Sequence, residues 1–132
     1  WAAWDEDDQI GDFGDPDDTH YREGVYVGYR YFDSTATAPL FPFGFGLGYT
    51  TFDVQIRQVS LDGARVSIDV DVTNTGGYPG KETIQVYASV PAGRLDQPLQ
   101  ALAGFTKTDE ITPGATARIT VDVDLTDLAS YD

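Results

Sequence analysis

The sequence contains no cysteine, no methionine and a single histidine, and only 8 of its 132 residues are basic. Without cysteine the chain has no disulfide, no thiolate metal site and no cysteine nucleophile. The single histidine, His20, excludes any site that needs two imidazoles. No apolar run approaches the roughly 20 residues that cross a bilayer. Because translation starts with methionine, Trp1 at the first position indicates a processed product or, as we expect, part of a longer protein.

The charge is strongly one-sided, because 22 acidic residues face 8 basic ones and the formal net charge is −14. This is the wrong sign for tracking phosphates or anionic lipid, so we expect neither nucleic acid nor a membrane as a partner. The 41% hydrophobic and 13% aromatic content is typical of a globular chain. At 132 residues the chain is long enough for one domain with a single core.

The composition divides the chain into three segments. Residues 1–20 hold eight acidic residues and no lysine or arginine, which predicts an acidic linker or surface loop. Residues 21–50 are rich in aromatic residues, glycine and proline, and are predicted to form an extended arm, including the stretch 21–32. From residue 51 to residue 132, apolar and polar residues alternate, which predicts a β-sheet domain.

The alternation has the period of half-buried strands. Strict apolar–polar alternation predicts strands at 65–73, 83–88 and 117–125. A further strand is expected at 52–60, joined to 65–73 by a hairpin turn at Asp62-Gly63. Several short strands with no helical period between them are typical of an all-β sandwich.

Few residues are candidates for chemistry. The acidic run suggests calcium, but the EF-hand pattern fails at Gln9, so a solvated run is the favoured interpretation. Glu23, Asp33 and Glu82 are the candidate catalytic carboxylates, and structural ion pairs are the commoner role for such residues. His20 follows the acidic run and no nucleophile elbow occurs, which indicates a surface histidine. We therefore expect no catalytic residue, metal ligand or cofactor in this chain.

The arm holds more aromatic residues than a small sandwich can bury. Such a surplus usually marks a docking surface, and glycines and prolines favour a segment that wraps against another domain. A platform that stacks on sugar rings is the alternative. The candidate interdomain docking residues are Tyr26, Tyr29, Tyr31, Phe41, Phe43, Phe45 and Tyr49.

Five collinear motifs between residues 21 and 110 resemble glycoside hydrolase family 3, the β-glucosidase family. They match the family's segments EG-x-YVGYRYYD, PLFPFGhGLSYTTF, VTNTG, GKEVVQLYV and LKGFxK. Gly48 stands where the family usually has serine. In this sequence the motifs occupy residues 21–33, 39–52, 72–76, 80–87 and 102–107.

The resemblance implies that residues 21–50 come from the junction with an α/β sandwich domain and that residues 51–132 form a fibronectin type III-like (immunoglobulin-like) domain. The parent would be a retaining enzyme that hydrolyses terminal β-D-glucosyl or related residues. The family's catalytic residues lie in domains upstream, so the piece alone is expected to be inactive.

Family members continue past residues 130–132 with two more strands. We therefore expect a sandwich that lacks its last two strands, with the parent continuing or a second chain completing it as a dimer or by strand swap. The expected function is a non-catalytic module that braces the upstream catalytic domains of the parent. The alternative is a free-standing carbohydrate-binding or adhesion module. The sugar, the linkage and the location, cytoplasmic or secreted, do not follow from the sequence.

Overall fold

A computed structural model describes residues 24–91 and 93–130. Three features of the sequence lie outside the described residues: the acidic segment 1–20 that was weighed for calcium binding, His20, and the candidate carboxylate Glu23. The chain divides into two compact units: Trp1–Phe45 with Ser89–Ala101, and Gly46–Ala88 with Leu102–Asp132. Within the described part, no helix has the length and apolar character that a membrane span requires.

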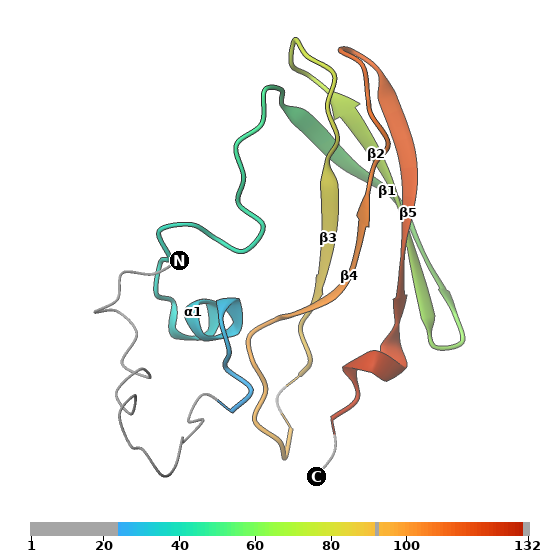
Figure 1. The fold of residues 1–132 in the computed structure, drawn as a ribbon. Helices are drawn as coiled ribbons and strands as arrows, with labels where there is room; N and C mark the ends of the chain where they lie inside the picture. Colours follow the sequence, from blue (N-terminus) through green and yellow to red (C-terminus); the bar gives the residue numbers. More distant parts are fainter. Residues whose placement is uncertain (1–23, 92, 131–132) are drawn as a thin grey trace, which may run out of the picture. The chain divides into compact units, whose positions relative to one another are not determined.

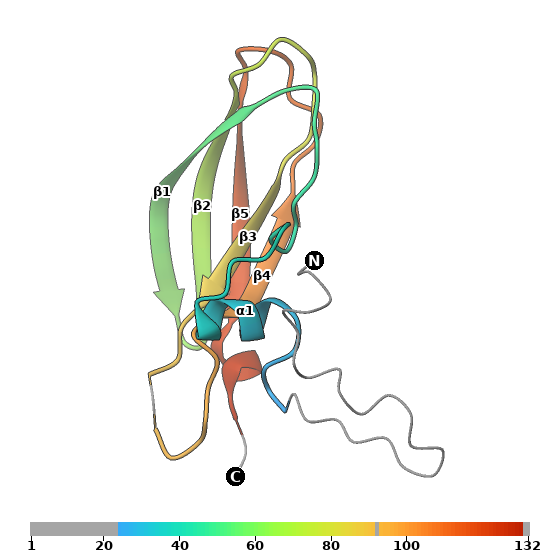
Figure 2. The ribbon, with the colours of Figure 1, turned by 90° about the vertical axis from the view of Figure 1, so that its left-hand side faces the viewer.

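The second unit is a two-layered β structure (Figures 1 and 2). One layer is a three-stranded antiparallel sheet in the order β1-β2-β5, and the other is the pair β3-β4. The strands are β1 (Phe52–Asp62), β2 (Arg65–Asn74), β3 (Thr83–Ala88), β4 (Ala101–Lys107) and β5 (Thr116–Asp124). A 3₁₀ helix, Leu125–Leu128, follows β5. The predicted all-β sandwich is confirmed.

The core lies between the two layers, where the apolar positions of the alternating strands meet. Its buried members come from β2, β3, β5 and the turn before β5: Val70, Val72, Ile84, Ile111 and Val121. The polar residues between them on β2 and β5 lie on the opposite face of the sheet, because successive side chains of a strand alternate sides.

The turn Asp62-Gly63 joins β1 to β2 as predicted, with Gly63 at a φ of 59°, in the left-handed region that favours glycine. Strand β4 was not anticipated from alternation. Its middle residue, Gly104, explains why: a Cβ there would lie 3.0 Å from the backbone oxygen of Asp122 in β5. The close approach of β4 to β5 thus requires glycine at position 104, although glycine has a low preference for strands.

Strand β1 carries one extra residue in its middle. Ile56 pairs with Val70, and Gln58 pairs with the adjacent residue, Asp69. Arg57 therefore has no partner in the register. This β-bulge changes the phase of the strand. Ile56 and Val59 therefore lie on the same face of the sheet although they are three residues apart.

The first unit contains a helix where the sequence predicted extended backbone. Residues 29–32 were predicted to be extended, but Tyr29–Thr35 form a short helix, α1. Gly28 precedes it with a φ of 61°, and Ala36 ends it in the left-handed region. No proline or glycine interrupts residues 29–35, so a helix is sterically possible there. Tertiary contacts then override the weak local preference for strand. Residues 36–48, after the helix, have no helix or strand, as predicted for the arm.

Candidate functional site

Among the residues that the structure describes, the arm presents the largest group of exposed aromatic side chains. Phe41, Phe43 and Phe45 are each 51–56% exposed. The rings of Phe41 and Phe45 lie 4.9 Å apart, and those of Tyr29 and Phe43 lie 5.3 Å apart, both in tilted contacts. These pairings hold the rings together at the surface of the first unit, although more than half of each phenylalanine remains accessible.

The other candidate docking residues are distributed differently. Tyr26, Tyr29 and Tyr31 are half-buried, and Tyr31 makes an edge contact with Phe32 at 5.4 Å. Tyr49 is 93% exposed and belongs to the second unit. Six of the seven predicted residues thus belong to the first unit, where ring contacts join Tyr29 with Phe43 and Phe41 with Phe45.

The loop between β3 and β4 is fastened to α1 and to the residues before it. Tyr26 Oη donates to Asp96 Oδ1 at 2.7 Å and to the Gln97 carbonyl at 3.3 Å. The Leu99 amide donates to Ser34 Oγ at 2.9 Å. The hydrogen bond to the Asp96 carboxylate raises the pKa of Tyr26, because it stabilises the protonated phenol.

Asp33, one of the three candidate catalytic carboxylates, takes part in the same fastening. Its Oδ2 accepts a hydrogen bond of 2.9 Å from Gln100 Nε2. A hollow of about 450 Å³ lies in this loop, lined by residues 89, 90 and 93–99, with Asp96 as its one carboxylate. Glycoside hydrolysis needs two facing carboxyl groups, so this hollow lacks that arrangement.

Glu82, another candidate, lies at the entrance to β3. Its Oε1 accepts from the Thr83 amide at 2.8 Å, and its own amide donates to Thr108 Oγ1 at 3.0 Å. The Glu82 carbonyl accepts from the Thr108 amide at 2.8 Å. These bonds join the start of β3 to the end of β4, which is a structural role.

Among the described residues, the carboxylate whose pKa is shifted most strongly is that of Asp71, which the sequence pattern did not single out. Arg118 Nε donates to its Oδ1 at 2.7 Å, and Arg57 Nε donates to its Oδ2 at 2.6 Å. The two guanidinium groups, Arg118 first, lower the pKa of Asp71 from 3.8 to about 2. A carboxylate this acidic stays ionised at neutral pH, so it stabilises the sheet and donates no proton.

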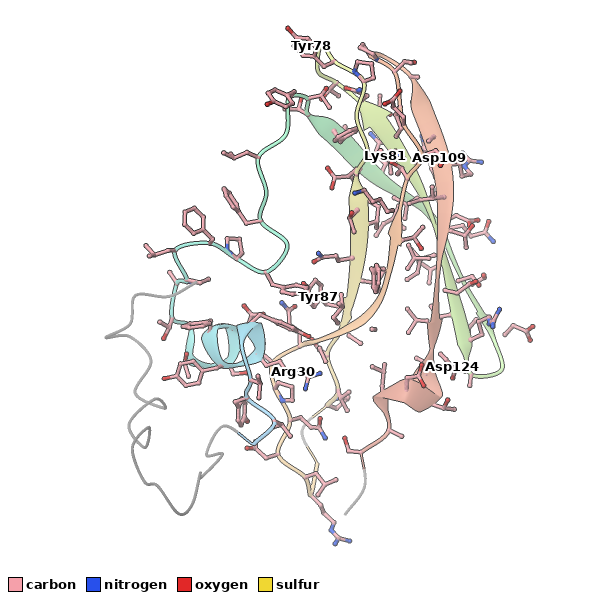
Figure 3. The ribbon with its side chains drawn as sticks, in the orientation of Figure 1. Arg30, Tyr78, Lys81, Tyr87, Asp109 and Asp124 are labelled. Atoms are coloured by element: carbon pink, nitrogen blue, oxygen red, sulfur yellow. The ribbon has the colours of Figure 1, made fainter. Side chains whose placement is uncertain are left out.

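At the end of β5, Asp124 caps the 3₁₀ helix, where Figure 3 labels it. Its Oδ1 accepts from the Thr126 amide at 2.9 Å and from the Thr126 hydroxyl at 2.7 Å. These hydrogen bonds lower the pKa of Asp124. Across the described ranges, no group of three or more His, Cys, Asp or Glu side chains is placed to hold a metal ion.

Comparisons with known proteins show which families and proteins this chain is similar to. Residues 82–132 match the family model described as a fibronectin type III-like domain. The β-glucosidase A of Butyrivibrio fibrisolvens is 39% identical and is aligned over 89% of this chain and 16% of its own length. A β-glucosidase of Rhizobium radiobacter is 40% identical over 85% of this chain and 14% of that protein.

Solved structures agree. A β-glucosidase from Paenibacillus barengoltzii matches 97% of this chain and 14% of its own, with 40% identity and a TM-score of 0.90. The β-glucosidase 3B from Thermotoga neapolitana in complex with glucose matches 85% of this chain and 16% of its own, with 42% identity and a TM-score of 0.79. The chain thus spans 14–16% of the length of these relatives.

Proposed function

Because this chain belongs to glycoside hydrolase family 3, as its fibronectin type III-like domain with the segment before it, we propose that it is a non-catalytic module that braces the catalytic domains of a longer glycosidase. That longer protein would hydrolyse terminal β-D-glucosyl or related residues with retention of configuration. The relatives that it matches are β-glucosidases several times its length, which supports this assignment.

The exposed aromatic cluster of the arm is the observation that carries the proposal. Phe41, Phe43 and Phe45 leave about half of each ring in water while they contact their aromatic neighbours. Burying such rings against another domain is favourable by about 25 cal/mol for each Å² removed from water. Four carboxylates make structural contacts in a loop, at a strand or at a helix end, which fits a bracing role rather than a reaction centre: Asp33, Glu82, Asp71 and Asp124.

The partner of this chain is the upstream catalytic domains of the parent or a second chain that completes the sandwich. The arm docks on the upstream catalytic domains through Tyr26, Tyr29, Tyr31, Phe41, Phe43, Phe45 and Tyr49. The last two strands of the sandwich come from the continuation of the parent, or from a second chain as a dimer or by strand swap.

The arm is tested in the longer protein that contains this chain. The double variant Phe43→Ala with Phe45→Ala is expected to lower the melting temperature by several degrees and to leave kcat for an aryl β-glucoside unchanged at temperatures well below melting. Tyr78→Ala is the matched control, because Tyr78 is 65% exposed in a turn of the other unit. An unchanged melting temperature in the double variant contradicts the docking role.

The isolated chain separates this function from the carbohydrate-binding alternative. The paired rings of Phe41 and Phe45 could also stack on a sugar, which is the observation in favour of that alternative. We expect the purified chain to give no heat of binding with cellobiose or soluble β-glucan, and no turnover of an aryl β-glucoside. Binding of either ligand that is lost in Phe41→Ala would establish the alternative instead.

A further inference from the structure

The first unit exposes apolar side chains from two segments that lie far apart in the sequence. One segment is the arm, which carries the phenylalanines described above. The other is the loop between β3 and β4, where Leu99 is 61% exposed and Val90 is 39% exposed. The seven candidate docking residues all belong to the first of these segments, so the exposed leucine of the β3–β4 loop still needs an explanation.

Helix α1 holds both segments (Figure 1). The ring of Tyr29, at the start of the helix, lies 5.3 Å from the ring of Phe43 in the arm. At the other end of the helix, Ser34 Oγ accepts a hydrogen bond of 2.9 Å from the Leu99 amide. The neighbouring Asp33 is bonded to the next residue of the loop. The arm and the β3–β4 loop are therefore mounted on one helix of seven residues.

The first unit also differs from the sandwich in its charges. Its described residues, 24–45, 89–91 and 93–101, hold two arginines and two aspartates and so have no net charge. Both aspartates, Asp33 and Asp96, accept hydrogen bonds within the unit. The described part of the second unit holds ten acidic and five basic residues. Interface cores are poor in charge and rich in aromatic residues and arginine, and the first unit has this composition.

We propose that the β3–β4 loop and the arm form one docking surface for the upstream catalytic domains, with Leu99 as the contact residue of the loop. This inference rests on the proposed function and adds a second contact segment to it. The partner is an apolar, weakly charged face of those domains. Ser34 is a positioning residue, because its hydroxyl holds the backbone of Leu99 beside the helix that carries the arm.

Three observations favour the catalytic domains over another occupant. The loop shares its mount with the arm, so one partner reaches both segments. The chain spans only 14–16% of its relatives, and a domain tethered in the same polypeptide has a high effective concentration. The net charge of −14 repels anionic partners from outside, whereas an uncharged apolar surface suits a neighbouring domain.

The hollow in the β3–β4 loop gives this contact a recess. It has a volume of about 450 Å³, and Leu95 and Leu99 are among its lining residues. Anchor side chains at protein interfaces fill pockets of this kind near the centre of the contact. We expect one projecting apolar side chain of the catalytic domains to occupy the hollow.

The proposal is tested first in the longer protein that contains this chain. Leu99→Asp should lower its melting temperature by several degrees and leave kcat for an aryl β-glucoside unchanged well below melting. Tyr78→Asp is the matched control, because it adds the same charge at a side chain of similar exposure, 65%, in the second unit. The proposal is overturned if Leu99→Asp melts with the wild type or no lower than the control.

The 132-residue chain on its own separates lost docking from misfolding. Because Leu99 already faces water there, Leu99→Asp should leave the urea midpoint of the isolated chain unchanged. An equal loss of stability in the isolated chain and in the longer protein would assign Leu99 to the fold of the first unit and overturn its docking role.

A double-mutant cycle in the longer protein tests the positioning role of Ser34. Ser34→Ala should lower the melting temperature when Leu99 is present and have much less effect in a Leu99→Ala background, since residues that act together are not additive. Ser34→Thr keeps the hydroxyl and should retain most of the wild-type value. Additive losses would show that Ser34 does not act through Leu99.

Amide hydrogen exchange provides a test without any variant. Residues 93–99 should exchange several-fold more slowly in the longer protein than in the isolated chain, because docking suppresses local opening of the loop. Equal rates in the two proteins would overturn the proposal. It fails separately from the bracing role: if Phe43→Ala with Phe45→Ala lowers the melting temperature and Leu99→Asp does not, the module docks through the arm alone.

Discussion

Asn74 Nδ2 donates a hydrogen bond of 2.8 Å to the Ile111 carbonyl, which joins the end of β2 to the turn before β5. The Asn74 side chain is fully buried. Its Nδ2 also donates to the Tyr78 carbonyl at 2.8 Å, and its Oδ1 accepts from Thr50 Oγ1 at 2.6 Å and from the Gly76 amide at 3.0 Å. One amide thus satisfies four groups from three segments that meet at one end of the sandwich.

Asn74→Ala should therefore destabilise the second unit more than a typical surface substitution does. It removes four hydrogen bonds at once, although the Ile111 carbonyl still accepts from the Gly80 amide at 3.1 Å, and the expected loss is about 3 kcal/mol. Urea denaturation followed by circular dichroism measures it. Tyr78→Ala is the control, because it keeps the carbonyl that Asn74 binds and removes a side chain that is 65% exposed. Equal losses in the two variants would contradict the bonding role of Asn74.

The two adjacent glycines of the same turn should respond differently to alanine. A Cβ on Gly76 would lie 2.8 Å from the Thr51 amide nitrogen, which is backbone and cannot rotate away. A Cβ on Gly77 would meet nothing within 4 Å. Gly76→Ala should thus cost about 1–3 kcal/mol, as overpacking does, while Gly77→Ala should be near neutral. Thermal melts of the two variants measure the difference. A lower melting temperature for Gly77→Ala than for Gly76→Ala would contradict this prediction.

The Asp71 ion pairs predict a specific dependence of stability on pH. The folded chain holds the pKa of Asp71 at about 2, below its ordinary 3.8, so the unfolded chain binds this proton more tightly. The contribution to stability is complete above about pH 4 and is lost as the pH falls toward 2. Urea midpoints of wild type and Asp71→Asn, measured from pH 2 to pH 6, should differ most at pH 6 and converge near pH 2. A constant difference would show that the ion pairs are not its source.

Tyr26 is expected to hold the β3–β4 loop in place. Tyr26→Phe removes the hydrogen bonds to Asp96 and to the Gln97 carbonyl. Amide hydrogen exchange in residues 93–99 should then become several-fold faster, since local opening loses two restraints. Tyr49→Phe, at a residue that is 93% exposed, is the control and should leave these rates unchanged. Unaltered exchange in Tyr26→Phe would show that Ser34 and Asp33 suffice to fasten the loop.

The sequence predicts the strands well where side chains alternate strictly. Alternation located β2 and β5, whose apolar residues are buried as expected. It failed for β4, where Gly104 is required by the approach of β5 rather than by the strand itself. It also failed at α1, because neighbouring aromatic residues suit either structure and the contacts that select the helix are distant in sequence. Local patterns cannot encode contacts of that kind.

The site shows the same limit. The aromatic surplus of the arm is visible in composition, and the pairing of Phe41 with Phe45 follows their spacing around Pro42 and Gly44. The roles of Asp71 and Asn74, in contrast, depend on which strands become neighbours. Asp71 lies opposite Arg118 only because β2 pairs with β5 in this register. The four bonds of Asn74 likewise need three turns to converge.

The bulge at Arg57 could have been found, since two polar residues, Arg57 and Gln58, separate Ile56 from Val59 where alternation demands one. Removing Arg57 alone would take out the bulge and restore strict alternation, so that every other side chain of β1 keeps its face and its partner on β2. A one-residue deletion is therefore tolerated by the register at this point. Anywhere else in β1, the same deletion would turn the side chains on one flank over to the other face, so that changes of length in this strand are expected at the bulge.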